Sequence, residues 1–366
     1  MTSVLTVNPG SSSLQAVIVD SDTERVLDKV HTETPADSDD ARRELAELLD
    51  RSRDIAAVGH RLVHGGDLVT PTVVDDAVVD RIKPACSLAP LHVPVTLRLL
   101  DMLRERMPDV PHVLCPDTAF HRDLPEVAAT YAVPAQWRQR FGLRRFGFHG
   151  LSFAWAAGRV RVPNLVVAHL GGGCSVCAIR DGRSVDTSMG FTPLDGVPMT
   201  KRSGSVDPGM LLWLIEHGGL TAEEVRTGLY EHSGLLGLSC GRSADTRELV
   251  RSGDPQARFA LDVFAHRVRQ ELAAMASNFD HLDALVFTGE IGWDQPEVRE
   301  SVCAGLGVLG IRGGLAGNQE VDGPISADDA DVPVHVVKAR EDIQLCRDTV
   351  FALRAPADRE GAAAGA

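Results

Sequence analysis

The sequence has no excess of basic residues: 37 lysines and arginines stand against 51 aspartates and glutamates, and the formal net charge is −14. Nucleic-acid binding normally requires a basic stripe that neutralises phosphates, so this composition argues against a nucleic-acid partner. The sequence also lacks any apolar run near the ~18 residues that a membrane-spanning helix requires, which argues against a membrane protein. The few clustered cations are therefore expected to serve a small anion.

Cysteines are few and do not form a recognisable framework. There are seven, an odd number spread along the chain, which predicts no set of disulfides. Cys174 and Cys177 form one C-x-x-C without a second pair to complete a zinc site, and we interpret them as residues on alternating faces of a strand. Residues 1–7 lead into a strand-like segment with no charged-then-apolar leader, so we expect a cytoplasmic protein.

Length and patterning predict an α/β protein with two domains. The 366 residues leave room for two domains of ~150 residues each. A strand, a hydroxyl-rich turn at Asn8–Ser13 and two further strands form one unit, and the same order returns around His169–Gly173. Asn8 and His169 take equivalent places, which suggests a duplicated domain, although any two α/β halves share such a pattern. Helical spacing predicts helices at 40–49, 95–103, 209–216 and 257–276.

Four glycine-bordered segments carry the polar groups of greatest interest. Arg144–Gly150 and Pro198–Gly204 each place cationic or imidazole groups beside glycines, which let a bulky anion approach the backbone. Asn8–Ser13 and His169–Gly173 add backbone N–H groups and short donors for phosphate oxygens. A plain hairpin turn is the alternative for Asn8–Ser13. Together the four segments predict a phosphoryl-transfer site made of short pieces, as in a kinase.

Other polar residues have both a functional and a structural interpretation. Arg61 stands between glycines at the end of a strand, which suits bidentate capture of a carboxylate or phosphate, or else a surface ion pair. Asp117 is interpreted as a helix cap, and His92 and His121 as core residues, unless they serve a site.

Three segments in the second half of the chain are equally ambiguous. Asp245–Arg247 is a nucleotide contact or the N-cap of a helix. The strand Ala284–Phe287 is expected to end in a glycine turn at Gly289–Gly292, beyond the carboxyl end of a strand, where nucleotide sites lie. Glu341 and Asp342 either hold Mg²⁺ or begin a helix with acidic residues in its first turn.

In order and content these motifs resemble the acetate kinase family, within the superfamily of acetate and sugar kinases, heat-shock chaperones and actin. The resemblance runs from Val4 to about Arg347. It rests on ten motifs: N-x-G-S-S-S (Asn8–Ser13), GHR-x-VHGG (Gly59–Gly66), LAPLH (Leu88–His92), DTAFH (Asp117–His121), R-x-GFHG (Arg145–Gly150), HLG-x-G (His169–Gly173), DTSMGFTPL (Asp186–Leu194), RSG (Arg202–Gly204), SGLLG (Ser233–Gly237) and FTG-x-IG (Phe287–Gly292).

The resemblance implies a fold, a reaction and an assembly. The fold is a duplicated two-domain, actin-like ATPase (ribonuclease H-like) fold with the active site in the interdomain cleft. The first domain is expected at 1–121 plus 343–366, and the second at 122–342, with most nucleotide contacts and the interface of a homodimer. The reaction is reversible in-line transfer of the ATP γ-phosphoryl to acetate or propionate, which gives an acyl phosphate and ADP, with Mg²⁺ or alternatively Mn²⁺.

The resemblance also assigns roles to residues. The catalytic residues are Arg61, Asp117, His149 and Arg202. The residues that bind the carboxylate and its acyl tail are Arg61, Val63, Leu91, His92, Phe148 and Pro193. The nucleotide contacts are Ser11, Ser13, His169, Gly171, Gly172, Gly173, Asp245, Thr246, Arg247, Glu290, Ile291 and Gly292. The metal-associated residues are Asn8 and Glu341.

Some positions depart from the family pattern. The departures are Gln15, Phe153, Gly172, Thr200, Lys201, Ser205, Glu290, Trp293 and Asp294. Most of them concentrate on the nucleotide side. Two alternatives therefore stay open: a related short-chain acyl kinase with a longer acid or another phosphate donor such as pyrophosphate, and a nucleotide or acyl-phosphate binding protein with a degraded ATP site.

Overall fold

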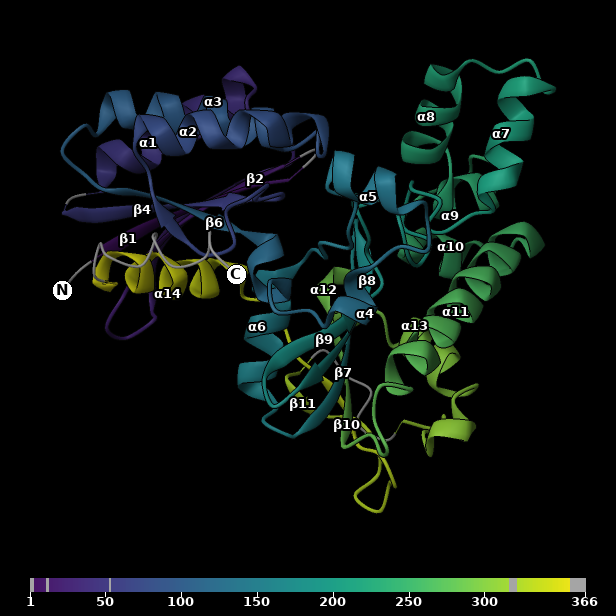
Figure 1. Cartoon of the computed structure of the whole chain (residues 1–366). Coiled ribbons are helices and arrows are strands. Elements are labelled where there is room, and N and C mark those ends of the chain that lie inside the picture. The colour runs from purple at the N-terminus through teal and green to yellow at the C-terminus, as the bar shows by residue number, and fades with distance from the viewer. Residues whose placement is uncertain (1–2, 11–12, 53, 316–320, 356–366) are drawn as a thin grey trace. The chain divides into compact units, whose positions relative to one another are not determined.

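The structure, a computed structural model, describes residues 3–10, 13–52, 54–315 and 321–355. The chain divides into two compact units, residues 1–119 with 340–366 and residues 120–339 (Figure 1). Each unit is built on one six-stranded mixed sheet with helices packed against it. The predicted α/β class is confirmed.

The sheet of the first unit has the strand order β3-β2-β1-β4-β6-β5. Its strands are β1 (Ser3–Pro9), β2 (Leu14–Asp20), β3 (Val26–Thr32), β4 (Ile55–Leu62), β5 (Thr72–Val73) and β6 (His112–Pro116). The strands β1, β4 and β6 run parallel, while β2, β3 and β5 pair antiparallel with their neighbours. β1 is buried on both faces, which is typical of a strand covered by helices on either side.

Helices cover both faces of this sheet (Figure 1). They are α1 (Asp39–Arg51), α2 (Asp76–Ile82), α3 (Val93–Arg106) and α14 (Glu341–Arg354), with 3₁₀ turns at η1 (Lys83–Ser87) and η2 (Asp117–His121). Leu5 packs in a core cluster with Leu45 of α1 and Leu99 of α3. Its neighbour Val4 packs on the opposite face with Cys346 of α14. Because successive side chains of a strand alternate between faces, one strand holds both layers together.

The sheet of the second unit, β11-β12-β10-β7-β8-β9, repeats the first. Its strands are β7 (Asn164–Leu170), β8 (Cys174–Arg180), β9 (Arg183–Thr187), β10 (Ala284–Thr288), β11 (Gly323–Pro324) and β12 (Val334–Val336). The parallel and antiparallel pairings correspond strand for strand to those of the first sheet. Asn8 and His169 are each the last residue but one of the first strand, so the predicted duplication is confirmed.

The helices of the second unit include the long α11 (Pro255–Ala276). The others are α4 (Glu126–Ala129), α5 (Ala135–Phe141), α6 (Gly150–Arg159), α7 (Pro208–Glu216), α8 (Ala222–Glu231), α9 (Gly234–Leu238), α10 (Thr246–Ser252), α12 (Gly289–Asp294) and α13 (Pro296–Cys303), with a 3₁₀ turn η3 (Gly307–Leu309). α11 begins at the N-cap Asp254 and packs on β7 and β8 through a buried stripe that includes Phe264, Val268 and Leu272. The four helices predicted from the sequence are all confirmed.

Two local predictions have different outcomes. The glycine turn predicted at Gly289–Gly292 is wrong, because these residues form the first part of helix α12. Gly289 has a φ of +79°, which turns the chain directly after β10, and burial of Ile291 stabilises the short helix. The strand prediction for Cys174 and Cys177 is confirmed, since both are buried in β8.

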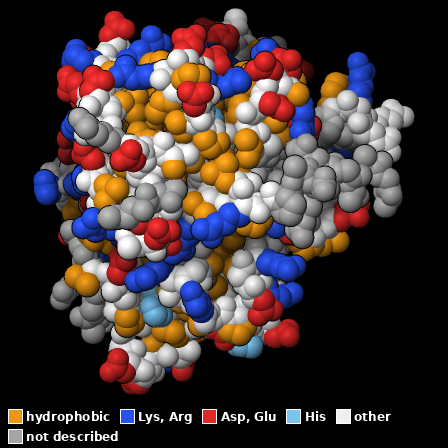
Figure 2. All heavy atoms as spheres, turned by 90° about the vertical axis from the view of Figure 1, so that its left-hand side faces the viewer, with side chains coloured by type: hydrophobic (Ala, Val, Ile, Leu, Met, Phe, Trp, Pro, Cys, Tyr) orange, Lys and Arg blue, Asp and Glu red, His pale blue; other side chains and the backbone are white. Residues whose placement is uncertain are grey.

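Acidic and basic side chains lie intermixed on the face that Figure 2 shows, with hydrophobic side chains between them. Exposed ion pairs such as Arg51–Asp28 and Arg98–Asp37 are solvent-screened and contribute little stability. In the part of the chain that the structure describes, no helix is both long enough and apolar enough to cross a membrane.

Candidate active site

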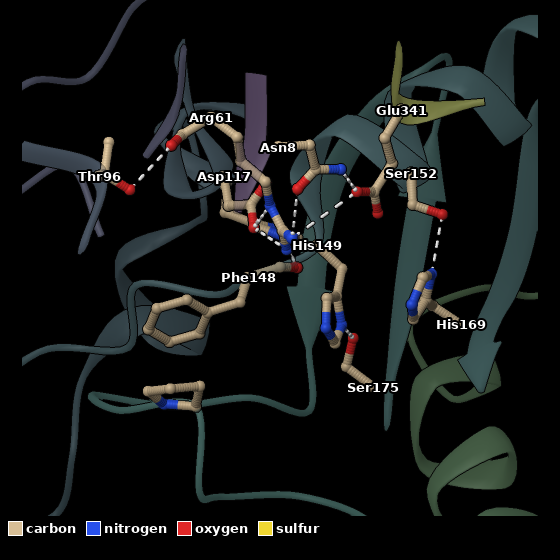
Figure 3. A network of polar contacts seen from close by, with 12 residues as sticks. Asn8, Arg61, Thr96, Asp117, Phe148, His149, Ser152, His169, Ser175 and Glu341 are labelled. Carbon is tan, nitrogen blue, oxygen red and sulfur yellow. Dashed lines mark hydrogen bonds and ion pairs between the residues drawn. The ribbon is translucent and has the colours of Figure 1, made fainter. Parts of the chain in front are cut away.

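The first unit gathers polar side chains at the carboxyl ends of its parallel strands (Figure 3). Arg61 is the last residue but one of β4, Asn8 has the same place in β1, and Asp117 directly follows β6. The register brings them together, because β4 pairs in parallel with both β1 and β6. In open α/β sheets this end of the strands is where ligands bind.

The guanidinium of Arg61 is the centre of this group. Its Nε and Nη2 donate to Oδ2 of Asp117 at 2.9 and 2.6 Å, and its Nη1 donates to Oδ1 of Asn8 at 3.0 Å. The Arg61 side chain is 14% exposed and that of Asp117 is fully buried, so the alternative of a surface ion pair is wrong. Burial alone would lower the pKa of Arg61, but the charges of Asp117 and Glu341 and the hydrogen bond to Asp117 raise it above its ordinary value. Arg61 is thus a fixed, permanent cation.

Glu341 is the first residue of α14 and turns its carboxylate toward the same group. Its Oε2 accepts a hydrogen bond from Nδ2 of Asn8 at 2.9 Å and lies 3.7 Å from Nη1 of Arg61. The neighbouring Asp342 is held by Arg340 instead, with Nη2 donating to Oδ2 at 2.9 Å. The acidic helix start predicted here is confirmed, and only one of its two carboxylates faces Arg61.

In the second unit, His149 adopts a conformation that is uncommon for a residue with a side chain. It is the N-cap of α6, with φ 58° and ψ 27° in the left-handed region. A non-glycine residue there costs of order 1–3 kcal/mol, and such positions cluster at functional sites. Nδ1 of His149 lies 2.7 Å from Oγ of Ser175, which orients the ring (Figure 3).

His169 has a matching arrangement at the end of β7. Its Nδ1 lies 2.8 Å from Oγ of Ser152, and its ring stacks on that of His149 at 4.2 Å between centroids (Figure 3). Both rings are largely buried. The Nε2 atoms face the glycine loop: a Cβ on Gly171 would lie 3.6 Å from Nε2 of His169, and one on Gly173 only 3.0 Å from Nε2 of His149. Because these glycines have no side chain, space is left next to the Nε2 atoms of both imidazoles.

Arg202 lies on a loop that approaches the same glycines. Its Nη1 donates to the carbonyl of Pro193 at 2.9 Å. The same Nη1 would lie 3.7 Å from a Cβ placed on Gly173. The SGLLG motif explains how the loop is held: N–H groups of Leu235 and Leu236 donate to the carbonyls of residues 199 and 200. Thr200 in turn donates from Oγ1 to the carbonyl of Gly172 at 3.0 Å. Two departures from the family pattern, at 172 and 200, thus contact each other.

The segments expected to contact the nucleotide are joined by side-chain pairs. Asp245 caps α10 by accepting from the N–H of Arg247 at 2.7 Å, so the N-cap interpretation is confirmed. Arg247 also pairs with Asp294 of α12. Trp293 donates from Nε1 to Oδ1 of Asp322 at 3.2 Å, and Nζ of Lys338 lies 4.2 Å from its ring centroid. The departures at 293 and 294 therefore have specific partners in this chain.

The remaining candidate residues lie in both units. Val63 is buried and Leu91 is 39% exposed in the first unit, where His92 is the N-cap of α3. Phe148 and Pro193 are buried in the second unit, as are Thr246 and Ile291, while Glu290 is exposed. Ser13 follows the turn after β1, where its carbonyl accepts from the N–H of Gly10. Ser11 lies outside the described residues.

The partners of the two histidines were not predicted from the sequence. Ser152 lies three residues after His149 on α6, and Ser175 lies opposite His169 in the hairpin of β7 and β8. A serine two residues beyond a glycine loop is a weak signal, because serine is common in turns. Its pairing with His149 becomes evident only from the packing of α6 on β7.

Gly173→Ala is expected to lower the turnover number about tenfold to a hundredfold. Its Cβ would lie 3.0 Å from Nε2 and 3.2 Å from Cε1 of His149, which would have to move. A displacement of ~1 Å of a reacting group can lower the rate by ~10²-fold, and about 1.4 kcal/mol in the barrier is a factor of ten in rate. Steady-state kinetics of the reaction that the resemblance implies check this.

Gly172→Ala is the control for the effect of an added methyl group on the fold, because a Cβ there would meet no described atom within 4 Å. It should leave the melting temperature of the ligand-free protein unchanged. A Gly173→Ala enzyme as fast as the parent would show that the space beside His149 is not used.

Two duplicated α/β units, a fixed arginine at the strand ends of one, and imidazoles beside a glycine loop in the other define a class of protein. The resemblance to the acetate kinase family implies that this class is a phosphotransferase whose acceptor is a carboxyl group. Comparisons with known proteins identify the family.

The sequence model of the acetokinase family matches residues 39–347. The chain is 43% identical to the acetate kinase of Deinococcus deserti over 324 aligned positions, which cover 84% of this chain and 80% of the relative. It is 36% identical to that of Thermosipho melanesiensis over 394 aligned positions, which cover 94% and 96%. The chain belongs to the acetokinase family.

Solved structures agree with this assignment. A propionate kinase from Francisella tularensis superimposes with a TM-score of 0.88 at 31% identity, over 96% of this chain and 100% of that one. The acetate kinase of Porphyromonas gingivalis superimposes with a TM-score of 0.83 at 30% identity, over 97% and 100%.

Proposed function

We propose that this protein is an acetate kinase, which reversibly transfers the γ-phosphoryl group of ATP to acetate or propionate. The observation that supports this most is the guanidinium of Arg61, which Asp117 and Asn8 hold at the carboxyl ends of three strands. These bonds use three of its five N–H donors among the described residues, which leaves donors for a carboxylate or an acyl phosphate. Each unit would act as one domain.

The chemistry requires little proton transfer. A carboxylate is already an anionic nucleophile: one of its oxygens forms a bond to the γ-phosphorus while the bond to the ADP oxygen breaks. The electron pair of that bond leaves with ADP. The obstacle is the approach of this anion to a polyanionic phosphate, and positioning with electrostatic stabilisation is what such sites supply.

Different residues of this chain would supply this positioning and electrostatic stabilisation. Arg61 would bind the carboxylate, since a guanidinium matches the geometry of its two oxygens. Arg202 would approach the migrating phosphoryl group. If Ser175 donates to Nδ1 of His149, the proton of that ring is on Nε2, where it can be donated to a phosphoryl oxygen. His169 and the glycines beside it would contact the nucleotide phosphates through N–H groups, and the segment at Asp245 would contact the nucleoside.

Magnesium is the metal that the residues of the first unit fit. Asn8 and Glu341 offer one amide oxygen and one carboxylate, the oxygen donors that Mg²⁺ prefers. In the described residues no three His, Cys, Asp or Glu side chains form a cage. Mg²⁺ often binds through one or two carboxylates, water and substrate phosphates, so Asn8 and Glu341 would hold it in that way. When bound, it neutralises charge on the phosphates; Mn²⁺ is the alternative.

The acid is either acetate or propionate, because the relatives include kinases named for both. Val63, Leu91, Phe148 and Pro193 would contact the acyl tail. One methylene in an apolar pocket changes specificity by only about 1–3 kcal/mol, so the two acids are expected to compete.

A hydroxamate assay for acyl phosphate tests the function. The purified protein is incubated with acetate, propionate or butyrate, and with ATP or pyrophosphate as donor. Acyl phosphate from ATP with acetate or propionate is the expected result. Product only with butyrate or only with pyrophosphate would indicate a related acyl kinase, and no product with any pair would indicate a binding protein.

We also propose a homodimer that forms through α7. Met210, Leu212, Trp213 and Ile215 of this helix are 42–58% exposed, although an apolar helix of this kind is normally buried. Apolar patches of this sort mark interaction sites, and most soluble oligomers are symmetric pairs of one chain. A second copy of α7 would cover the patch.

The double variant Leu212→Asp/Trp213→Asp is expected to be monomeric. Both side chains are more than half exposed, so the charges should not disturb the fold of one chain. Light scattering after gel filtration should give 39.3 kDa for the variant and twice this mass for the parent. Val127→Asp, at a site 91% exposed on α4, should remain dimeric. A variant that keeps the parent mass would contradict an interface at α7.

A further inference from the structure

His121 is a buried histidine with a partner at each ring nitrogen. Its Nε2 lies 2.9 Å from the carbonyl oxygen of Phe148, and its Nδ1 lies 2.7 Å from Oγ of Ser184. The ring packs edge-on against Phe153 and is 1% exposed. All these residues belong to the second unit.

The partners determine which nitrogen carries the proton. A carbonyl oxygen only accepts, so Nε2–H of His121 donates to Phe148. Nδ1 then accepts from the hydroxyl of Ser184, whose oxygen lies 3.3 Å from the thiol of Cys177. Burial lowers the pKa of His121 to about 4, although the hydrogen bond to Phe148 opposes this, so the ring is neutral at pH 7.

The carbonyl that His121 holds comes directly before His149. On its other side is Gly147, with φ +75°, where a Cβ would lie 2.5 Å from Cγ of His121. The ring of His121 therefore contacts the backbone at 147 and bonds to it at 148. These two contacts determine the direction from which the chain enters the left-handed conformation of His149.

A left-handed conformation of this kind persists only where the surroundings impose it. The side chain of His149 is held by Ser175, and its carbonyl accepts from the N–H of Phe153 at 3.0 Å. Both contacts lie at or after residue 149. The hydrogen bond from Nε2 of His121, by contrast, is made to the carbonyl of Phe148, the residue before His149.

We infer that His121 is a positioning residue: its Nε2–H bond to the carbonyl of Phe148 holds the backbone of His149 so that the imidazole faces Gly173. This inference rests on the proposed function for its kinetic consequence, because His149 would face the migrating phosphoryl group. His121 itself touches no reacting atom.

Two variants at one site separate this hydrogen bond from simple packing. The amide nitrogen of Gln reaches the position of Nε2, whereas that of Asn reaches only the position of Nδ1. His121→Asn should lower kcat by ~10²-fold, as a displacement of ~1 Å of a reacting group does, with little change in the KM for either substrate. His121→Gln should recover most of this loss.

A second readout does not need turnover. Imidazole ¹H–¹⁵N spectra report which nitrogen of His149 carries the proton, with His149→Gln used to assign the signals. The pattern should change in His121→Asn and return in His121→Gln. His266→Asn, the same substitution at an exposed histidine of α11, should change neither kcat nor the His149 signals.

The outcomes are distinguishable. If His121→Asn keeps the kcat and His149 spectrum of the parent, or if Gln and Asn variants are impaired equally, the inference is wrong. If the parent makes no acyl phosphate with any donor, the proposed function fails. The spectra then decide alone, and an unchanged His149 pattern in His121→Asn would overturn the inference.

Discussion

Replacing Arg202 with alanine is expected to lower the turnover number by ~10²–10³-fold or more. Removing one preorganised donor to developing charge typically has an effect of this size, and an arginine on the transferred phosphoryl group can contribute ~10³–10⁵-fold. In this chain Arg202 is held by the carbonyl of Pro193 and lies near the glycine loop. The measurement is kcat with both substrates saturating.

The neighbouring lysine supplies the control. Lys201 carries the same charge one residue away, but its side chain is exposed. Lys201→Ala should keep nearly normal turnover. If Arg202→Ala is also nearly normal, Arg202 has no role at the phosphoryl group.

Arg61→Ala is expected to reduce both activity and stability. It leaves the fully buried carboxylate of Asp117 without its cation, and breaking a buried ion pair costs about 3–5 kcal/mol of unfolding free energy. It also removes the group proposed to bind the carboxylate, so kcat/KM for acetate should fall ~10²-fold or more. Urea unfolding and steady-state kinetics measure the two effects.

The double variant Arg61→Ala/Asp117→Ala separates them. Without either charge, no buried ion is left uncompensated, so most of the lost stability should return. Activity should not return, because the cation is still missing. A double variant with restored turnover would show that Arg61 acts only on stability.

The fold was largely predictable because its signals are local. Apolar β-branched segments such as Val4–Val7 and Leu165–Ala168, separated by turn residues, encode strands wherever they occur. The helix at Gly289–Asp294 was missed because two glycines in six residues have poor helix propensity, and burial of Ile291 decides the outcome. The sequence pattern favoured neither a duplicated domain nor two unrelated α/β halves. The matching strand order of the two sheets favours duplication.

The candidate site was predictable in its residues but not in its contacts. Local patterns could not show that Arg61 pairs with a residue 56 positions later, or that Asn8 contacts one 333 positions later. Such pairs arise from sheet register and from the return of α14 to the first unit. The sequence favoured a core role for His121, and the burial of this residue confirms that role. The hydrogen bond of His121 to the carbonyl of Phe148 was not predicted.

In the proposed reaction a carboxylate oxygen attacks the γ-phosphorus of ATP. Acetate labelled with ¹⁸O in its carboxylate, incubated with ATP and the purified protein, tests it by ³¹P NMR. We expect an acyl phosphate signal with the isotope shift of one ¹⁸O bound to phosphorus. An unshifted acyl phosphate signal, or only inorganic phosphate from ATP, would contradict it.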